Sequence, residues 1–223
     1  MQPRLVLFDC DGTLIDSAGV IVAAMTEAFV RSGLVAPPAA EIRGIIGLSL
    51  PSAVAVLSAR HPEAPVAALV DAYKTAYRDS VSEESLHEPL FPGIAEALDR
   101  VEDERTLLGI VTGKSRRGLT RVLASHSLSA RFVVTRTADD AASKPSPDMV
   151  LQSLAETGAA AARTVVIGDT SFDMAMAKAA GTRAIGVSWG YHAVAELRAA
   201  GAEAIAHAAA ELPDIVDALL PHD

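Results

Sequence analysis

Residues 4–17 read RLVLFDCDGTLIDS, and this stretch decides the fold of the chain. Residues 4–8 form a nearly continuous apolar run that stops at Asp9, which is typical of a strand buried on both faces of a parallel sheet. Asp9 and Asp11 stand two positions apart, and Gly12 allows the tight turn that lets both carboxylates face one site. The same residues could also do no more than shape a turn or cap the next helix.

Similar apolar runs recur along the chain, at residues 106–111, 131–135, 164–167, 183–187 and 204–206. Helix-like segments separate these runs, at residues 93–102, 116–126, 147–157 and 172–180. Strands that alternate with helices predict an α/β fold with an open, doubly wound parallel sheet. Ligands of such sheets bind beyond the carboxyl ends of the strands, so the polar residues after each run are the candidates for chemistry.

One region, residues 16–88, breaks this alternation because it contains no convincing strand. Its apolar residues recur at helical spacing, and we expect helices at residues 17–32, 41–46, 51–60 and 65–79. The proline-containing segment at residues 88–93 ends the helical pattern. We therefore expect a helical cap domain at residues 16–91, inserted after the first strand of an α/β core that comprises residues 1–15 and 92–223.

The composition of the chain excludes several classes of protein. Of its 223 residues, 50% are hydrophobic and 21% are charged, which is enough apolar surface to fold a globular domain. The net charge of −9, without a basic stretch, argues against a nucleic-acid partner. No apolar run approaches the length of a membrane span, and the single cysteine, Cys10, cannot form an internal disulfide. We expect a cytoplasmic protein, monomeric or homodimeric, with no membrane partner.

Two further strand ends carry candidate phosphate contacts. Residues 112–115, Thr-Gly-Lys-Ser, follow the second run, and a hydroxyl with free N–H groups at a helix start forms an anion site. Thr112, Gly113 and Lys114 are therefore candidates for substrate binding, although an ordinary strand-to-helix turn could carry them too. Lys144 precedes a rigid Pro-Ser-Pro turn that can aim its charge at a phosphate, unless it is simply a solvated loop lysine.

The fourth candidate group is a second pair of carboxylates. Asp169 follows the run at residues 164–167, and Asp173 lies in the first turn of the next expected helix. Oxygen ligands from these two residues, together with Asp9 and Asp11, suit a hard cation such as Mg²⁺. Helix capping is the alternative explanation for this pair of aspartates.

The four groups together are far more specific than any one of them. In chain order, the strand ends carry a pair of aspartates, a hydroxyl with backbone amides, a lysine, and a second pair of aspartates. This order closely resembles that of the haloacid dehalogenase superfamily, and the resemblance extends over nearly the whole chain. The helical insert is similar to that of the members that include phosphoglycolate phosphatases. The resemblance implies a Rossmann-like core and a Mg²⁺-dependent phosphatase for a small-molecule phosphate monoester, with phosphoglycolate as a leading candidate.

The resemblance also implies a role for each residue near the phosphoryl group. Asp9 matches the nucleophile that forms an aspartyl-phosphate, and Asp11 matches the acid and base that serves the leaving group and then water. The Thr112 hydroxyl and the Gly113 N–H match groups that bind the phosphoryl oxygens. Lys144 matches the lysine that balances the charges of nucleophile and phosphate.

The metal ligands follow from the same resemblance. Asp169 matches a Mg²⁺ ligand, joined by an oxygen of Asp9 and the backbone carbonyl of Asp11. Asp173 matches a carboxylate that supports the metal directly or through water. Arg43 of the expected cap is a candidate for contacting a substrate carboxylate, with a solvated helix arginine as the plainer alternative. A phosphomutase of the β-phosphoglucomutase type, a pyrophosphatase and a non-catalytic binding protein remain open on the same scaffold.

Overall fold

The computed structural model describes residues 2–61, 64–82 and 88–221. Six strands form one sheet in the order β3-β2-β1-β4-β5-β6, and every neighbouring pair is parallel. The strands are β1 Arg4–Phe8, β2 Thr106–Val111, β3 Phe132–Arg136, β4 Thr164–Gly168, β5 Arg183–Val187 and β6 Ala204–Ala206. This doubly wound sheet confirms the predicted α/β fold class.

The central strand β1 shows why an unbroken apolar run was needed. Successive side chains of a strand point to opposite faces, so both faces of a covered sheet must be apolar. Val6 and Phe8 enter the apolar cluster on one face, whereas Leu5 and Leu7 enter the cluster on the other. All five residues of β1 are buried.

Helices cover both faces of the sheet. The first layer contains α5 Ile94–Val101, α6 Arg116–Ser125 and α10 Leu212–Leu219. The second layer contains α7 Asp148–Thr157, α8 Ser171–Ala180 and α9 Val194–Ala200. Helices α9 and α10 were not predicted, because α9 has only seven residues and α10 carries a proline in its first turn.

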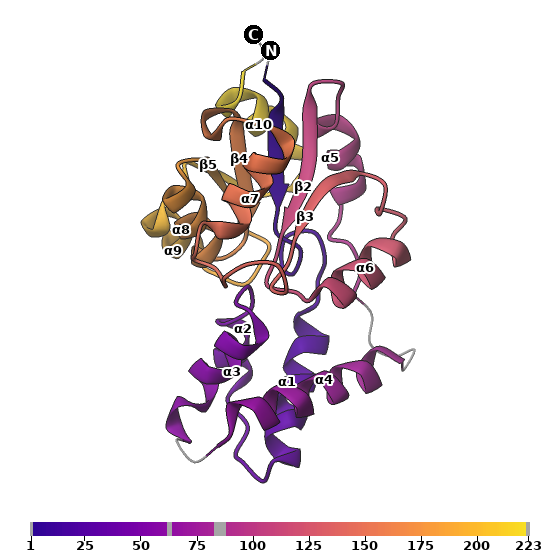
Figure 1. Cartoon of the computed structure of the whole chain (residues 1–223), viewed down its shortest axis with the longest axis vertical. Coiled ribbons are helices and arrows are strands. Elements are labelled where there is room, and N and C mark those ends of the chain that lie inside the picture. The colour runs from indigo at the N-terminus through magenta and orange to yellow at the C-terminus, as the bar shows by residue number, and fades with distance from the viewer. Residues whose placement is uncertain (1, 62–63, 83–87, 222–223) are drawn as a thin grey trace.

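The remaining helices form a separate packed unit beyond the carboxyl edge of the sheet (Figure 1). They are α1 Ala18–Arg31, α2 Ala39–Arg43, α3 Leu50–Leu57 and α4 Val66–Ser82. Their inward side chains, among them Met25, Phe29 and Val54, form a third apolar cluster distinct from the two clusters on the sheet. The expected cap range of residues 16–91 includes residues 62–63 and 83–87, and the expected core range includes residues 1 and 222–223, which lie outside the described residues.

The second helix of this unit differs from its prediction. It begins after Pro38 and ends at Arg43, whereas a helix at residues 41–46 was expected. Residues 44–49 form a loop instead, and within it Gly47 has a positive φ of 104°, which a helix does not allow. Among the described helices, none combines the length and apolar character that crossing a membrane requires.

Candidate active site

The sheet order brings the distant motifs together at one edge. Strands β2 and β4 flank β1 on its two sides, so Thr112, Asp9 and Asp169 follow three adjacent strands. Lys144 enters from the loop between β3 and α7. These four side chains are almost fully buried, with exposed fractions between 0% and 2%.

Lys144 bridges two carboxylates at the centre of the site. Its Nζ lies 2.7 Å from Oδ1 of Asp9 and 2.6 Å from Oδ1 of Asp173. Burial disfavours the charge on the lysine, but the two carboxylates more than compensate and hold the pKa of Lys144 above its usual value. The ammonium group therefore stays charged inside the protein.

Three carboxylates form a buried acidic triad beside this lysine. Asp9, Asp169 and Asp173 each offer an oxygen within 4.8 Å of the others. Burial is the main cause that raises the pKa of Asp9 to about 7, although Lys144 opposes it. Burial also raises the pKa of Asp169, and the charges of Asp9 and Asp173 raise it further. The site concentrates negative charge that the described residues neutralise only in part.

The triad fits a divalent cation. Oδ2 of Asp9 is buried and has no hydrogen-bond partner among the described residues, which is costly for a carboxylate oxygen. Hard divalent cations take carboxylate oxygens as ligands, and such a charge would also relieve the repulsion within the triad. The orphaned oxygen and the three close carboxylates are thus compatible with one bound metal ion.

Asp169 and Asp173 are held in different ways. Asp169 accepts hydrogen bonds from the Thr13 hydroxyl at 2.9 Å and from the Tyr191 backbone N–H at 2.9 Å. Oδ2 of Asp173 accepts bonds from the backbone and hydroxyl of Thr170, in the capping box that starts α8. Because Lys144 takes its other oxygen, both oxygens of Asp173 are already engaged within the protein.

Two glycines leave space for the side chain of Asp169. A Cβ at Gly12 would collide with the carboxyl group of Asp169, and a Cβ at Gly190 would collide with its side chain as well. Gly12 also has a positive φ of 89°, which L-residues rarely adopt. The turn after Asp11 therefore needs glycine at position 12 for two reasons: the positive φ of the backbone and the close approach of the Asp169 carboxyl group.

Asp11 lies outside the triad and belongs to a second polar network. Its Oδ1 lies 2.8 Å from Nζ of Lys114, which also lies 3.2 Å from Oε1 of Glu88. Glu88 in turn accepts a hydrogen bond from the Tyr77 hydroxyl at 2.5 Å and pairs with Arg121. Burial opposes ionisation of Glu88, but these three donors together hold its pKa below the usual value.

The loop at residues 44–49 covers the Thr-Gly-Lys-Ser segment after β2. The Thr112 hydroxyl accepts a hydrogen bond from the Lys114 N–H at 3.2 Å. A Cβ at Gly113 would lie 2.5 Å from the carbonyl oxygens of both Gly47 and Leu48. In addition, the Ser49 N–H donates to the Ser143 hydroxyl at 2.9 Å. The helical unit therefore touches the core directly over the candidate site.

One predicted contact is not brought to the site. Arg43 is exposed at the end of α2, and it is not among the residues that line the cavity between the two units. Its position at the surface gives no support to a contact with a substrate carboxylate.

Several residues of the site had no assigned role in the sequence analysis. Thr13, Thr170 and Tyr191 orient the acidic triad, and Glu88 and Tyr77 hold Lys114. Thr13 directly follows the Asp-Gly turn, and this position in the sequence could have indicated that it contacts the site. Glu88 and Tyr77 carry no such signal, because they meet the site only through the packing of α4 and the segment that returns to the core.

Comparison with known proteins identifies the family. A family model for haloacid dehalogenase-like hydrolases matches residues 6–187. The Dickeya dadantii protein named "Probable phosphatase IndB" is 35% identical over 99% of this chain and 96% of its own length. A phosphoglycolate phosphatase of Xanthomonas campestris is 32% identical over 85% of each chain. A crystal structure of a hydrolase from Pseudomonas syringae is 27% identical, with a TM-score of 0.84 over 97% of this chain and 99% of that chain.

These similarities confirm the resemblance that the four strand-end motifs predicted, and they confirm the prediction of a hydrolase. The family match extends from β1 to β5, so it includes all four motifs and the helical unit between β1 and β2. The chain belongs to the family of haloacid dehalogenase-like hydrolases.

Proposed function

We propose that this protein is a Mg²⁺-dependent phosphatase that hydrolyses a small-molecule phosphate monoester through an aspartyl-phosphate on Asp9. The observation that carries the proposal is the state of the Asp9 carboxylate. Lys144 holds Oδ1, whereas Oδ2 is buried without a hydrogen-bond partner among the described residues. Oδ2 is thus left for the metal, and Oδ1, beside the charge-balancing lysine, suits nucleophilic attack on phosphorus.

Lys144 and the loop after β2 suit the role of phosphate binding. A phosphate dianion and a carboxylate repel each other, so their approach needs positive charge or hydrogen-bond donors. We assign that charge to Lys144, and we assign hydrogen bonding of the phosphoryl oxygens to the Thr112 hydroxyl and the Gly113 N–H. Catalysis of this kind depends mainly on positioning and electrostatics, which a buried and hydrogen-bonded site favours.

Asp11 suits the role of acid and base. We propose that it protonates the leaving alkoxide and later takes a proton from the water that attacks the aspartyl-phosphate. Lys114 lies 2.8 Å from its carboxylate and fixes the direction in which it points. We keep Lys114 as a substrate-side residue because it also lines the cavity next to Asp11.

We assign the Mg²⁺ ligands to Asp9, Asp169 and the backbone carbonyl of Asp11. When bound, Mg²⁺ supplies positive charge next to the phosphoryl oxygens. Asp173 has both oxygens engaged by Lys144 and Thr170, which favours a supporting role through water over direct ligation. Thr13 and Tyr191 hold Asp169 in the orientation that ligation requires.

We propose that residues 16–91 act as a cap domain. The loop at residues 44–49 lies over Gly113, and Asp9, Thr112 and Lys144 are buried beneath it. A phosphate group reaches Asp9 only when this unit moves, and its return excludes bulk water from the reaction. The cytoplasmic location and the monomeric or homodimeric state remain predictions.

The decisive experiment measures phosphate release from a panel of esters that includes phosphoglycolate, the compound in the name of the Xanthomonas campestris relative. We expect turnover with Mg²⁺, no turnover with a chelator, and a loss of at least about a thousandfold in Asp9→Asn. Asp16→Asn is the matched control, because Asp16 lies in the same stretch but is exposed. Activity that survives in Asp9→Asn would refute the proposal, and an isomerised sugar phosphate without free phosphate would indicate a phosphomutase instead.

A further inference from the structure

We propose that the preferred substrate is a phosphate monoester whose leaving alcohol has a bulky, largely apolar body. This inference rests on the proposed phosphatase function and names the substrate class that the same site would select. It differs from a preference for phosphoglycolate, whose leaving group is a two-carbon acid. The argument comes from the cavity that opens beside Asp11.

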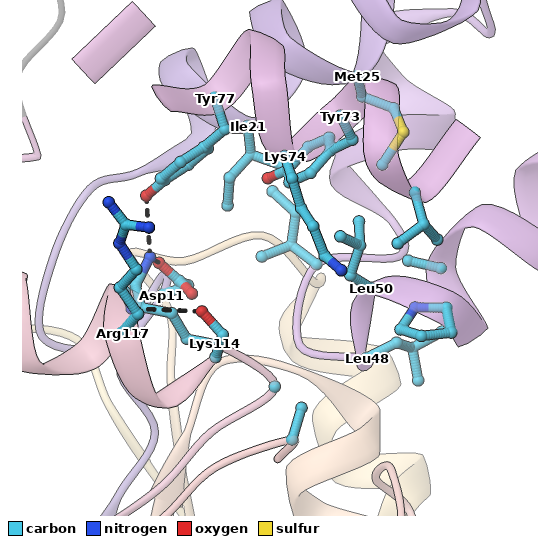
Figure 2. A pocket seen from close by; sticks show the side chains of 18 of the residues that line it. Asp11, Ile21, Met25, Leu48, Leu50, Tyr73, Lys74, Tyr77, Lys114 and Arg117 are labelled. Carbon is cyan, nitrogen blue, oxygen red and sulfur yellow. Dashed lines mark hydrogen bonds and ion pairs between the residues drawn. The ribbon is translucent and has the colours of Figure 1, made fainter. Parts of the chain in front are cut away.

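A cavity of about 1140 Å³ lies between the helical unit and the core. Its core end contains Asp11 and Lys114, and Figure 2 shows these two side chains below a wall of apolar groups from the helical unit. That wall consists mainly of side chains from α1, the loop at residues 44–49, α3 and α4, namely Ile21, Met25, Ile45, Ile46, Leu48, Leu50, Val70 and Tyr73. The acid that would serve the leaving group therefore opens directly onto an apolar chamber.

The size of this chamber exceeds what a two-carbon leaving group needs. Pockets of about 300–1,000 Å³ hold ligands of drug size, and this cavity of about 1140 Å³ is slightly larger than that. Glycolate has almost no apolar surface with which to displace water from the wall. A larger apolar alcohol would remove both its own surface and the wall from water, which is favourable in proportion to the area buried.

The charges in the chamber also disfavour a carboxylate near Asp11. Lys114 is the cation next to Asp11, and it is shared between Asp11, Glu88 and the Tyr77 hydroxyl. Arg121 also pairs with Glu88, so both cations beside this pair of carboxylates are already engaged, and Asp11 itself would repel a second carboxylate. Besides Lys114 and Arg121, the cavity is lined by Lys74, Arg78 and Arg117, which are exposed and suit the attraction of an anionic ester from solution.

A series of primary n-alkyl phosphates from methyl to hexyl tests the inference. Their leaving alcohols have nearly the same chemistry, so the series changes the apolar size and leaves the reacting bond alone. We expect kcat/KM to rise about two- to fourfold with each added methylene. Hexyl phosphate should then exceed methyl phosphate by roughly thirtyfold or more, and it should also exceed phosphoglycolate.

A matched pair of variants locates the effect in the chamber. Leu50 lines the cavity, whereas Leu34 is partly buried against the same apolar cluster but does not line it. We expect Leu50→Ser to reduce the dependence on chain length, and Leu34→Ser to retain it. Binding of the matching alkyl phosphonates, which are not hydrolysed, should show the same trend and does not depend on turnover.

The possible outcomes separate the two proposals. If no ester of any length is hydrolysed with Mg²⁺, the phosphatase proposal fails, and phosphonate binding still decides whether the chamber selects apolar groups. If esters are hydrolysed but kcat/KM is flat along the series, or highest for phosphoglycolate, the inference about the leaving group is overturned. An equal loss of chain-length dependence in both leucine variants would also overturn it.

Discussion

The two ends of the candidate active site are built on opposite principles. The core end contains buried charges, and Lys144, Asp169 and Asp173 are each fixed by hydrogen bonds in the segments that follow β3 and β4. The helical end is mostly apolar, and side chains of three helices and one loop define its shape. Charged groups require exact partners, whereas apolar walls require only volume and area. The difference indicates that the reaction is encoded in short motifs and the choice of substrate in distributed packing.

The largest effect should come from removing the central cation of the core end. In Lys144→Met, Asp9 and Asp173 lose their shared partner while remaining buried. Leaving buried charges unpaired costs about 3–5 kcal/mol, and Asp9, the proposed nucleophile, would also repel phosphate without compensation. We expect the free energy of unfolding in urea to fall by about this amount, with loss of turnover.

Lys178→Met is the control for this variant, because Lys178 lies exposed on α8. It should leave the urea midpoint and the turnover close to those of the wild type. Equal stability of Lys144→Met and Lys178→Met would show that the buried carboxylates do not depend on the lysine.

A smaller effect should separate backbone strain from crowding of Asp169 at the proposed metal site. Gly12 and Gly158 both have positive φ values, 89° and 70°, but only a Cβ at Gly12 would meet Asp169. Both Gly12→Ala and Gly158→Ala should lose about 1 kcal/mol of stability from the strained backbone. Only Gly12→Ala should also weaken Mg²⁺ binding, measured by calorimetry, because only this change displaces the carboxylate.

Similar Mg²⁺ affinity in the two glycine variants would contradict the assignment of Asp169 as a ligand. It would place the metal on other oxygens of the site. A loss of stability in Gly12→Ala alone would instead indicate that crowding, and not the positive φ, determines the cost.

The comparison also explains which parts of the molecule could be predicted from sequence. The strands at residues 106–111, 183–187 and 204–206 have the predicted bounds, because strands buried on both faces leave a continuous apolar signal. The polar residues after β1 and β4 meet at one edge because parallel strands all end there. The acidic triad could therefore be anticipated from residue order alone.

The helical end could not be predicted to the same degree. The helix expected at residues 41–46 forms instead at Ala39–Arg43, where a proline and two glycines set the limits. Glu88 reaches Lys114 from a segment far from any motif, so its role depends on tertiary packing. An apolar helix face shows that a helix is buried, but it does not show whether a cavity remains beside it.

Glu88 connects the two ends, and its neutralisation should have a moderate effect. In Glu88→Gln, Lys114 and Arg121 lose their common carboxylate inside a largely buried network. We expect a loss of about 1–3 kcal/mol in stability and a lower kcat/KM, because Lys114 is then held less firmly against Asp11. Glu156→Gln is the control, since Glu156 pairs with Arg136 but is about half exposed, and it should change stability by less than about 1 kcal/mol. Equal effects of the two substitutions would show that burial of the Glu88 network adds nothing.

The smallest effect concerns pH and the metal together. In the metal-free protein, folding raises the pKa of Asp9 from 3.8 to about 7, mainly through burial, so the folded state binds more protons than the unfolded state between these values. Stability should therefore be greater at low pH and fall as pH rises through 7, and the raised pKa of Asp169 acts in the same direction. Lys144 and Lys114 have raised pKa values that matter only at more alkaline pH, and the lowered pKa of Glu88 matters only at more acidic pH.

We expect the Tm in a chelating buffer to fall by a few degrees between pH 5.5 and pH 8, since each kcal/mol corresponds to about 2–4 °C in a chain of this size. Mg²⁺ binds the ionised carboxylates, so it should raise the Tm more at pH 8 than at pH 5.5. Asp9→Asn removes the titrating group and should flatten both trends. A Tm that rises with pH in the absence of metal would mean that the triad is already neutralised within the protein, and the need for a divalent cation at the core end would disappear.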